Sequence, residues 1–243
     1  MIGDIYFGKG DVIVIYVMSD IHGMYDKYME MLELIHFNDN DVLYILGDVI
    51  DRGSEPVKIL LDMMSRKNVY PLLGNHEYMA IQCLEWLSKE ITEENLRGVD
   101  ADKLNKLSDW MNNGGYATIK AFKALTPEQR EAIIDYIYEF TLVEEVSVNG
   151  MDFVLTHAGI KGFDKNRDLD SYDVEDYVWE RPDLEVPYFE DKFTIIGHTP
   201  TLAITGEPEI IVYNKFVDID CGACFNGGKL ACLCLDTLQE FYV

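Results

Sequence analysis

The 243-residue sequence is poor in basic residues. It carries 20 Lys and Arg against 44 Asp and Glu, and its formal net charge at pH 7 is −24. Non-specific binding to nucleic acid relies on Lys and Arg side chains that neutralise phosphates, so this composition argues against that function. An anionic substrate must be attracted by local charge, such as that of metal ions, because the overall field of the protein repels it.

Long apolar runs are also missing. No run approaches the roughly 18 residues that span a bilayer, and the apolar stretch Val12–Met18 ends in Ser-Asp. Residues Met1–Asp11 contain two Asp and one Lys, so they lack the basic start of a signal peptide. We therefore interpret Val12–Met18 as a buried strand, and we expect a cytoplasmic protein without membrane or nucleic-acid partners.

Cysteines are few and odd in number: Cys83, Cys221, Cys224, Cys232 and Cys234. An odd number in a chain of this length does not indicate a disulfide framework. The last four form C-x2-C and C-x-C pairs within fourteen residues, so a structural zinc site is one interpretation. We favour free thiols, because Cys232 and Cys234 share one face of an expected strand and buried thiols behave as small hydrophobic groups.

The first eighty residues alternate short apolar runs with helical patterns. Beyond the first strand, we expect strands at Val42–Leu46 and Val69–Leu73, and helices at Tyr25–Ile35 and Pro56–Ser65. Such alternation is typical of βαβ units with a largely parallel sheet, so the sequence predicts an α/β fold.

Between about residues 78 and 140 the strand-like runs vanish. Helix-forming residues dominate Tyr78–Lys89 and Pro127–Glu139, and Asn112–Gly115 is the strongest break. We expect a helical insertion in a single domain over residues 1–243.

After residue 140 the strand patterns return, at Leu142–Val148, Asp152–Thr156, Phe193–Ile196, Ile210–Tyr213, Phe216–Ile219 and Lys229–Leu235. The acidic segment Asp164–Asp191 has no such pattern. We interpret it as an irregular, solvated loop, with a docking surface as the alternative.

Five short segments carry polar side chains directly after apolar strands. They are Ser19–Gly23 (SDIHG), Gly47–Gly53 (GDVIDRG), Gly74–Glu77 (GNHE), Thr156–Gly159 (THAG) and Gly197–Pro200 (GHTP). In open α/β sheets, ligands bind beyond the carboxyl ends of the strands. We therefore expect the five segments to meet at one sheet edge.

Six of these side chains are candidate metal ligands: Asp20, His22, Asp48, Asn75, His157 and His198. Asp20 and His22 can bind one ion, and Asp48 can bridge two ions with its two carboxylate oxygens. The other three side chains can complete the shell of the second ion. Mixed oxygen and nitrogen ligands suit manganese, iron or zinc rather than calcium, so we expect two divalent cations, with manganese preferred.

Three neighbouring residues suit the chemistry of phosphate esters. His76, next to a candidate ligand, can protonate a leaving oxygen as general acid. Asp51 is the candidate to hydrogen-bond the other ring nitrogen of His76, and Arg52 can hold phosphate oxygens with its planar fork of donors. His36 lies outside every motif, and we interpret it as a structural residue.

At these motifs the sequence resembles the calcineurin-like metallophosphoesterases. More narrowly, it is similar to the PPP-type serine/threonine phosphatases, especially the small bacterial and lambda phage members. The narrower resemblance rests on GDVIDRG, GNHE, THAG and IGHTP, and the stretch Trp110–Tyr116 (WMNNGGY) matches an Asn-Gly-Gly segment of the bacterial members.

The resemblance implies layered, mixed β-sheets flanked by helices, and the same metal ligands and general acid as above. It adds Arg181, in a W-x-R motif at Trp179–Arg181, as a second residue that binds the phosphate. The implied reaction is hydrolysis of phosphoserine and phosphothreonine in proteins, with phosphotyrosine as a further substrate. Water activated by the metals attacks the phosphorus directly, and His76 is the general acid.

Two alternatives stay open. Symmetrical bis(5'-nucleosyl)-tetraphosphatases resemble the chain closely but typically carry Ala at the position of Asp51 and GNHD instead of GNHE, so hydrolysis of these or other small phosphate esters is the second hypothesis. A non-catalytic binding module is the third, although every expected catalytic position is filled. Cys221 replaces the usual Thr of I-D-T-G-A, which would place a thiol near the site.

Overall fold

The computed structural model describes residues 13–89 and 98–243, which form two five-stranded sheets. The first sheet has the order β10-β9-β1-β2-β3. Its strands are β1 (Ile15–Met18), β2 (Val42–Ile45), β3 (Val69–Pro71), β9 (Ala231–Cys234) and β10 (Glu240–Tyr242). Strands β1, β2 and β3 are parallel, as the βαβ pattern predicts, whereas β9 runs antiparallel to both β1 and β10.

The second sheet has the order β4-β5-β6-β8-β7. Its strands are β4 (Val143–Val148), β5 (Met151–Thr156), β6 (Lys192–Ile196), β7 (Ile211–Tyr213) and β8 (Phe216–Asp218). The three central strands are parallel and the two edge strands are antiparallel to their neighbours. The predicted α/β fold with mixed, layered sheets is confirmed.

The sheets pack against each other through alternate residues of their strands. Val17 and Leu233 of the first sheet share one buried cluster with Leu155 and Ile195 of the second. Their neighbours point to the opposite face, because successive side chains of a strand alternate. Cys232 and Cys234 therefore lie together in the larger core on the outer side of the first sheet, which is the packing expected of core thiols.

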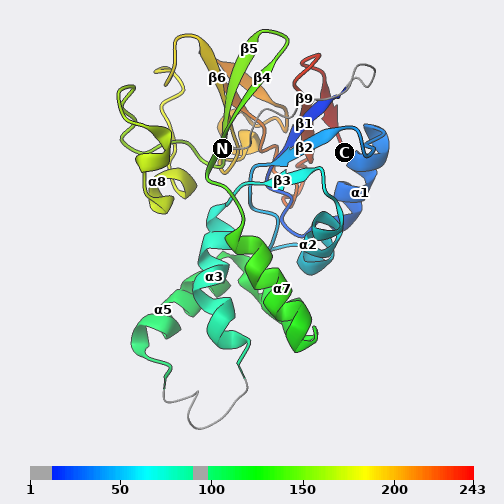
Figure 1. The fold of residues 1–243 in the computed structure, drawn as a ribbon, viewed down its shortest axis with the longest axis vertical. Helices are drawn as coiled ribbons and strands as arrows, with labels where there is room; N and C mark the ends of the chain where they lie inside the picture. The colour runs from blue at the N-terminus through cyan, green and yellow to red at the C-terminus, as the bar shows by residue number, and fades with distance from the viewer. Residues whose placement is uncertain (1–12, 90–97) are drawn as a thin grey trace.

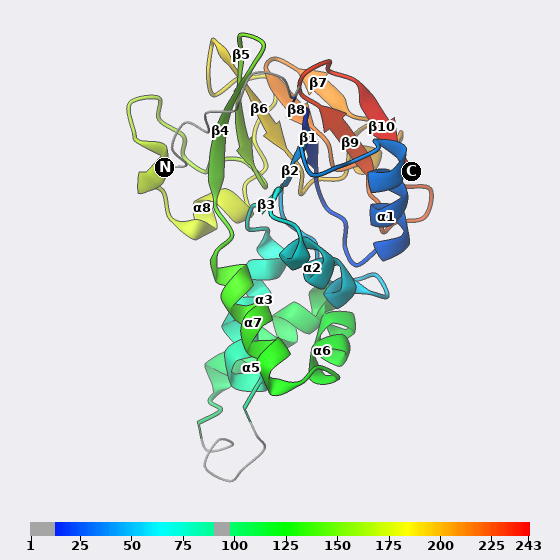
Figure 2. The same cartoon turned by 45° about the vertical axis from the view of Figure 1, so that its right-hand side comes forward.

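Two helices cover that outer face, α1 (Tyr25–Leu34) and α2 (Pro56–Ser65). Pro56 occupies the start of α2, where its missing N–H has no partner to lose. Both helices lie beside the first sheet in Figures 1 and 2, and each connects two neighbouring parallel strands.

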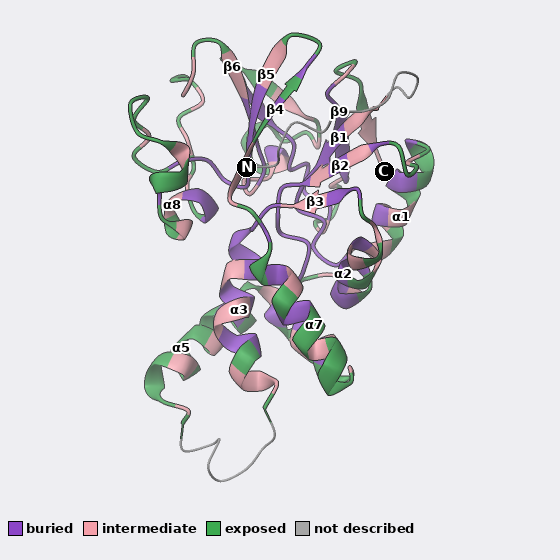
Figure 3. Cartoon of the chain, viewed as in Figure 1, coloured by how far each residue is buried: buried purple, intermediate pink, exposed green. Residues whose placement is uncertain are grey.

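Between β3 and β4, the described residues form four α-helices that project from the sheets (Figures 1 and 2). They are α3 (Asn75–Leu87), α5 (Ala101–Trp110), α6 (Tyr116–Lys123) and α7 (Pro127–Tyr138). Helix α3 is buried where it meets the sheets, and α5 is largely exposed (Figure 3). The predicted break becomes a kink at Gly114, whose φ is 106°. That this segment is an insertion in a single domain stays a prediction.

Besides α5 and α6, for which no range was predicted, several short elements had no counterpart in the sequence-based expectations. The acidic segment is not wholly irregular, because it contains α8 (Val174–Val178), which Asp173 and Asp176 cap at its start. Helix α9 (Thr201–Thr205) follows the GHTP motif, and β10 pairs with β9 at the end of the chain. None of the described helices is long and apolar enough to cross a bilayer.

Removal of a buried side chain from the packing between the two sheets should destabilise the fold. Ile195 is fully buried there, whereas Ile204 of α9 is 50% exposed. We expect Ile195→Ala to lower the free energy of unfolding by about 2–5 kcal/mol, and the matched control Ile204→Ala to change it by less than about 0.5 kcal/mol. Urea denaturation followed by circular dichroism measures both, and equal effects would contradict this packing.

Candidate active site

The five polar motifs do come together, but from two sheets rather than one sheet edge. Three follow β1, β2 and β3 of the first sheet, and two follow β5 and β6 of the second. Hydrogen bonds join the two groups: His157 Nδ1 lies 2.6 Å from the Leu46 carbonyl oxygen, and the His198 N–H donates to Asp20 Oδ2 at 2.9 Å. Because the sheets pack face to face, their carboxyl ends share one end of the sandwich.

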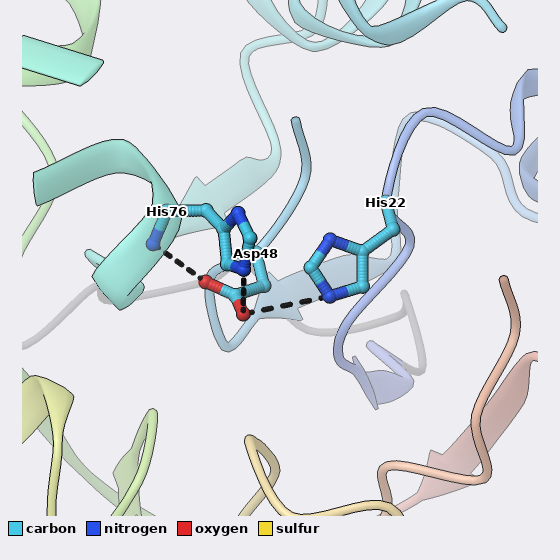
Figure 4. A group of neighbouring side chains, drawn as sticks. All are labelled: His22, Asp48 and His76. Carbon is cyan, nitrogen blue, oxygen red and sulfur yellow. Dashed lines mark hydrogen bonds and ion pairs between the residues drawn. The ribbon is translucent and has the colours of Figure 1, made fainter. Parts of the chain in front are cut away.

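Asp48 lies at the centre of the site. Its Oδ2 is 3.5 Å from His22 Nε2 and 3.8 Å from His76 Nε2, and Figure 4 shows both rings directed at this carboxylate. Its Oδ1 is 3.5 Å from His157 Nε2. Two sets of side chains have atoms spaced to hold a metal ion, His22–Asp48–His76 and Asp48–His157–His198. Asp48 belongs to both sets, which is the arrangement expected of a bridging carboxylate.

The tautomers of His22 and His157 leave the Nε2 atom of each ring free to bind a metal ion. A carbonyl oxygen only accepts, so Nδ1 of His157 must donate to Leu46, and Nδ1 of His22 must donate to the Ile50 carbonyl at 3.0 Å. In the neutral rings, each Nε2 is then left with a lone pair. Burial holds the pKa of His22 well below its usual value, and this keeps the ring neutral.

Asn75 completes a group of acceptors around a small space. Its Oδ1 lies 3.0 Å from His157 Nε2 and 2.9 Å from His198 Nδ1. Burial is the main cause that lowers the pKa of His198 to about 2, so this ring is also neutral. A lone pair of His157 that faces an amide oxygen is unfavourable unless a cation lies between them. The residues present therefore fit a divalent cation.

Backbone strain is concentrated in the motifs. Six candidate site residues adopt positive φ, namely Asp20 (50°), His22 (47°), Asp48 (53°), Asp51 (71°), Arg52 (61°) and His198 (68°). Non-glycine residues rarely adopt this conformation, and such strain tends to occur at functional sites. Gly197 is required for the same close packing, because a Cβ there would collide with Ser19 and Asp20.

Glu77 ties two of the motifs together, a function that the sequence-based analysis did not assign to it. Its carboxylate is fully buried and accepts hydrogen bonds from the N–H groups of Asp48 (2.8 Å), Val49 (2.9 Å), Ile50 (3.1 Å) and Gly74 (3.2 Å). Burial raises the pKa of Glu77, and the hydrogen bonds partly offset this shift. The glutamate of GNHE was the available signal.

The predicted partner of His76 is in place. His76 Nδ1 lies 2.6 Å from Asp51 Oδ2, and both side chains are buried. Burial alone would lower the pKa of His76, but the charge of Asp48 and the hydrogen bond to Asp51 outweigh it, so the pKa is raised. Asp51 also contacts two residues of the helical segment, Trp110 and Thr118.

Arg52 spans the site with its guanidinium group. Its Nη1 is 2.8 Å from His22 Nε2, and its Nη2 is 3.0 Å from His76 Nε2. On its other side lie the ring of Phe225, 5.4 Å away, and Cys224 Sγ at 3.7 Å. The thiol that contacts the site is thus that of Cys224, whereas Cys221 is buried and burial raises its pKa to about 12.

The W-x-R motif lies beside His198. The Trp179 ring is 6.1 Å from the His198 ring, and the charge of Arg181 contributes to the low pKa of His198. The direct contact between this motif and the candidate residues is therefore that of Trp179 with His198. Two buried carboxylates that were not predicted, Asp218 and Asp220, lie near Asp20, and burial raises the pKa of both well above the usual value.

The fold and this set of side chains define a metal-dependent phosphoesterase. The profile of the calcineurin-like phosphoesterase family matches residues 13–221, so the chain belongs to that family.

The relatives differ in their named substrates. The symmetrical bis(5'-nucleosyl)-tetraphosphatase of Wigglesworthia glossinidia brevipalpis is 36% identical over 40% of this chain, which spans only 36% of that relative's length. The asymmetrical bis(5'-nucleosyl)-tetraphosphatase PrpE of Halalkalibacterium halodurans is 26% identical over 88% of this chain and 87% of its own. Serine/threonine-protein phosphatase 2 of Salmonella typhimurium is 26% identical over 70% of this chain and 69% of its own.

Solved structures share the fold. A candidate diadenosine tetraphosphatase superposes with a TM-score of 0.64 at 14% identity, over 95% of this chain and 92% of that one. A serine/threonine phosphatase from Saccharomyces cerevisiae has a TM-score of 0.56 at 14% identity, over 92% of this chain and 72% of that one.

Loss of one candidate ligand should reduce metal binding. We expect His157→Asn to lower the number of Mn²⁺ ions bound from about two per chain to about one, because one shell loses an imidazole. Isothermal titration calorimetry measures the stoichiometry. The matched control is His36→Asn, at an exposed histidine with a φ of 53°, which asparagine tolerates. Unchanged stoichiometry in His157→Asn would show that this ring is not a ligand.

Proposed function

We propose that this protein is a phosphomonoesterase that removes phosphate from phosphoserine and phosphothreonine in proteins, with phosphotyrosine as a further substrate. The observation that carries the proposal is the buried Asp51–His76 pair, with a distance of 2.6 Å between Oδ2 and Nδ1. Such a pair supplies a proton to a leaving oxygen, and serine and threonine oxygens are poor leaving groups that need one.

Two divalent cations, Mn²⁺ by preference and iron or zinc otherwise, belong to this proposal. Asp20, His22 and Asp48 would hold one, and Asp48, Asn75, His157 and His198 would hold the other. When bound, they lower the pKa of water and neutralise charge on the phosphoryl oxygens.

The side chains of the protein carry out the remaining steps. Arg52 and Arg181 hold the phosphate oxygens and orient the ester for in-line attack. As water adds to phosphorus, the bond from phosphorus to the ester oxygen breaks. The electron pair of that bond stays on the ester oxygen, which takes the proton from Nε2 of His76. Asp51 accepts a hydrogen bond from Nδ1 throughout and stabilises the charged ring.

A second candidate is hydrolysis of a dinucleoside tetraphosphate. Two exposed aromatic side chains at the site favour it, Phe225 beside Arg52 and Trp179 beside His198, which are 46% and 42% exposed. Exposed rings can stack on nucleobases. Two of the relatives described above also carry names of tetraphosphatases.

Removal of the acid should lower turnover. We expect His76→Asn to reduce kcat on a phosphoserine peptide by about 10²- to 10⁴-fold in the presence of Mn²⁺, and Asp48→Asn to reduce it at least as strongly. Phosphate release measures both. The control is His36→Asn, and turnover at the wild-type level in both site variants would sink the mechanism.

The two substrate classes can be compared directly. We expect kcat/KM for a phosphoserine peptide to exceed that for diadenosine tetraphosphate by at least about tenfold, because the site is built to protonate a poor leaving oxygen. Assays with Mn²⁺, Fe²⁺ and Zn²⁺ measure both substrates. A ratio reversed in favour of diadenosine tetraphosphate under every metal would replace the first proposal by the second.

A further inference from the structure

Apart from α3, which carries Asn75 and His76, the helical segment contacts the site through the stretch Trp110–Thr118, at the kink between α5 and α6. We propose that Trp110 and Thr118 are positioning residues, which hold the Asp51 carboxylate in the one orientation that aligns His76 for proton donation. This inference rests on the proposed function, because it requires His76 to act as the general acid.

Two donors from the helical segment hold the two oxygens of the carboxylate. Trp110 Nε1 donates to Oδ2 of Asp51 at 2.7 Å, the same oxygen that accepts from His76 Nδ1 at 2.6 Å. Thr118 Oγ1 donates to Oδ1 at 2.5 Å. A carboxylate held at one oxygen can rotate about its Cβ–Cγ bond, whereas contacts at both oxygens fix its plane. Since Asp51 is fully buried, water does not substitute for these donors.

Thr118 also holds the backbone of Asp51. The Asp51 N–H donates to Thr118 Oγ1 at 3.0 Å, so the hydroxyl group donates and accepts toward the same residue. Asp51 adopts a φ of 71°, a conformation that aspartate rarely takes without support from its surroundings. The hydroxyl therefore stabilises a strained backbone as well as a side-chain orientation.

The two glycines of the Asn-Gly-Gly run allow the backbone of the helical segment to pack closely against Arg52 and Trp110. Gly114 has a φ of 106°, its carbonyl accepts from the Arg52 N–H at 3.1 Å, and a Cβ there would approach Arg52 Cγ to 2.8 Å. Gly115 lies against the indole of Trp110, which is fully buried, and a Cβ there would approach Nε1 to 2.7 Å. One kinked turn thus supports both Asp51 and Arg52.

A residue that positions the general acid affects the reaction differently from a residue that only stabilises the fold, because its loss slows some substrates more than others. Hydrolysis of an ester with a good leaving group, such as p-nitrophenyl phosphate, gains little from the acid, whereas phenyl phosphate needs the proton. Loss of alignment therefore slows phenyl phosphate selectively. Loss of metal or of folded protein slows both substrates equally.

The test compares Trp110→Phe with Trp86→Phe. Both replace an indole in the helical segment, but Trp86 Nε1 has no hydrogen-bond partner among the described residues. We expect Trp110→Phe to lower kcat for phenyl phosphate about tenfold more than kcat for p-nitrophenyl phosphate, with KM for each changed less than about twofold. Trp86→Phe should leave the ratio of the two kcat values unchanged.

Thr118→Val removes the hydroxyl group and keeps the volume, and it provides a second variant if Trp110→Phe does not fold. Thr118→Val should lower the ratio of kcat for phenyl phosphate to kcat for p-nitrophenyl phosphate, as Trp110→Phe does. Thr118→Ser, which keeps the hydroxyl group, should leave this ratio at the wild-type value. Melting temperature and bound metal are measured for each variant. Equal losses on both substrates in folded Trp110→Phe and Thr118→Val, or the same change of ratio in Trp86→Phe, would overturn the inference.

Asp51→Asn separates this inference from the proposed function. If Asp51→Asn and His76→Asn show no selective loss on phenyl phosphate, the acid mechanism itself fails. If both show it while Trp110→Phe and Thr118→Val do not, the mechanism stands and the positioning function of the helical segment is wrong.

Discussion

The buried carboxylate of Glu77 is the contact on which the rest of the site depends. It accepts hydrogen bonds from four backbone N–H groups, three in the loop after β2 and one before α3. A buried carboxylate and buried N–H groups are each unfavourable when unpaired, so the two loops stabilise each other only in this arrangement. The same contact sets Asp48 at the centre of the site, within reach of histidines from both sheets.

Packing of the two sheets then completes the site. The bond from His157 Nδ1 to the carbonyl of Leu46 links the second sheet to the first, and it also selects the tautomer that leaves Nε2 available as a ligand. Positive φ angles at residues such as Asp20 and His198 are tolerated because this packing holds them on every side. The strain is the cost of directing many polar side chains at one point.

The helical segment contacts Asp51 at the kink between α5 and α6, and not along the length of its helices. Most of α5 is exposed, yet Trp110 at its end is fully buried against Gly115 and reaches Asp51. Asp51 therefore receives donors from the helical segment while it contacts His76 of α3. Relatives of this chain are named for different phosphate substrates.

The sequence by itself determined strands β1 to β9, helices α1, α2, α3 and α7, and the short polar motifs, because each depends on local periodicity or on residues within one turn. It also indicated the pairing of His76 with Asp51, through the family resemblance and the chemistry of the two side chains. Only the tertiary structure decided that the motifs come from two sheets, that Glu77 joins their loops, and that Trp110, Thr118, Cys224 and Phe225 border the site. These contacts join residues up to 178 positions apart, as for Asp20 and His198. No local pattern encodes them, since they arise from the packing of separate elements.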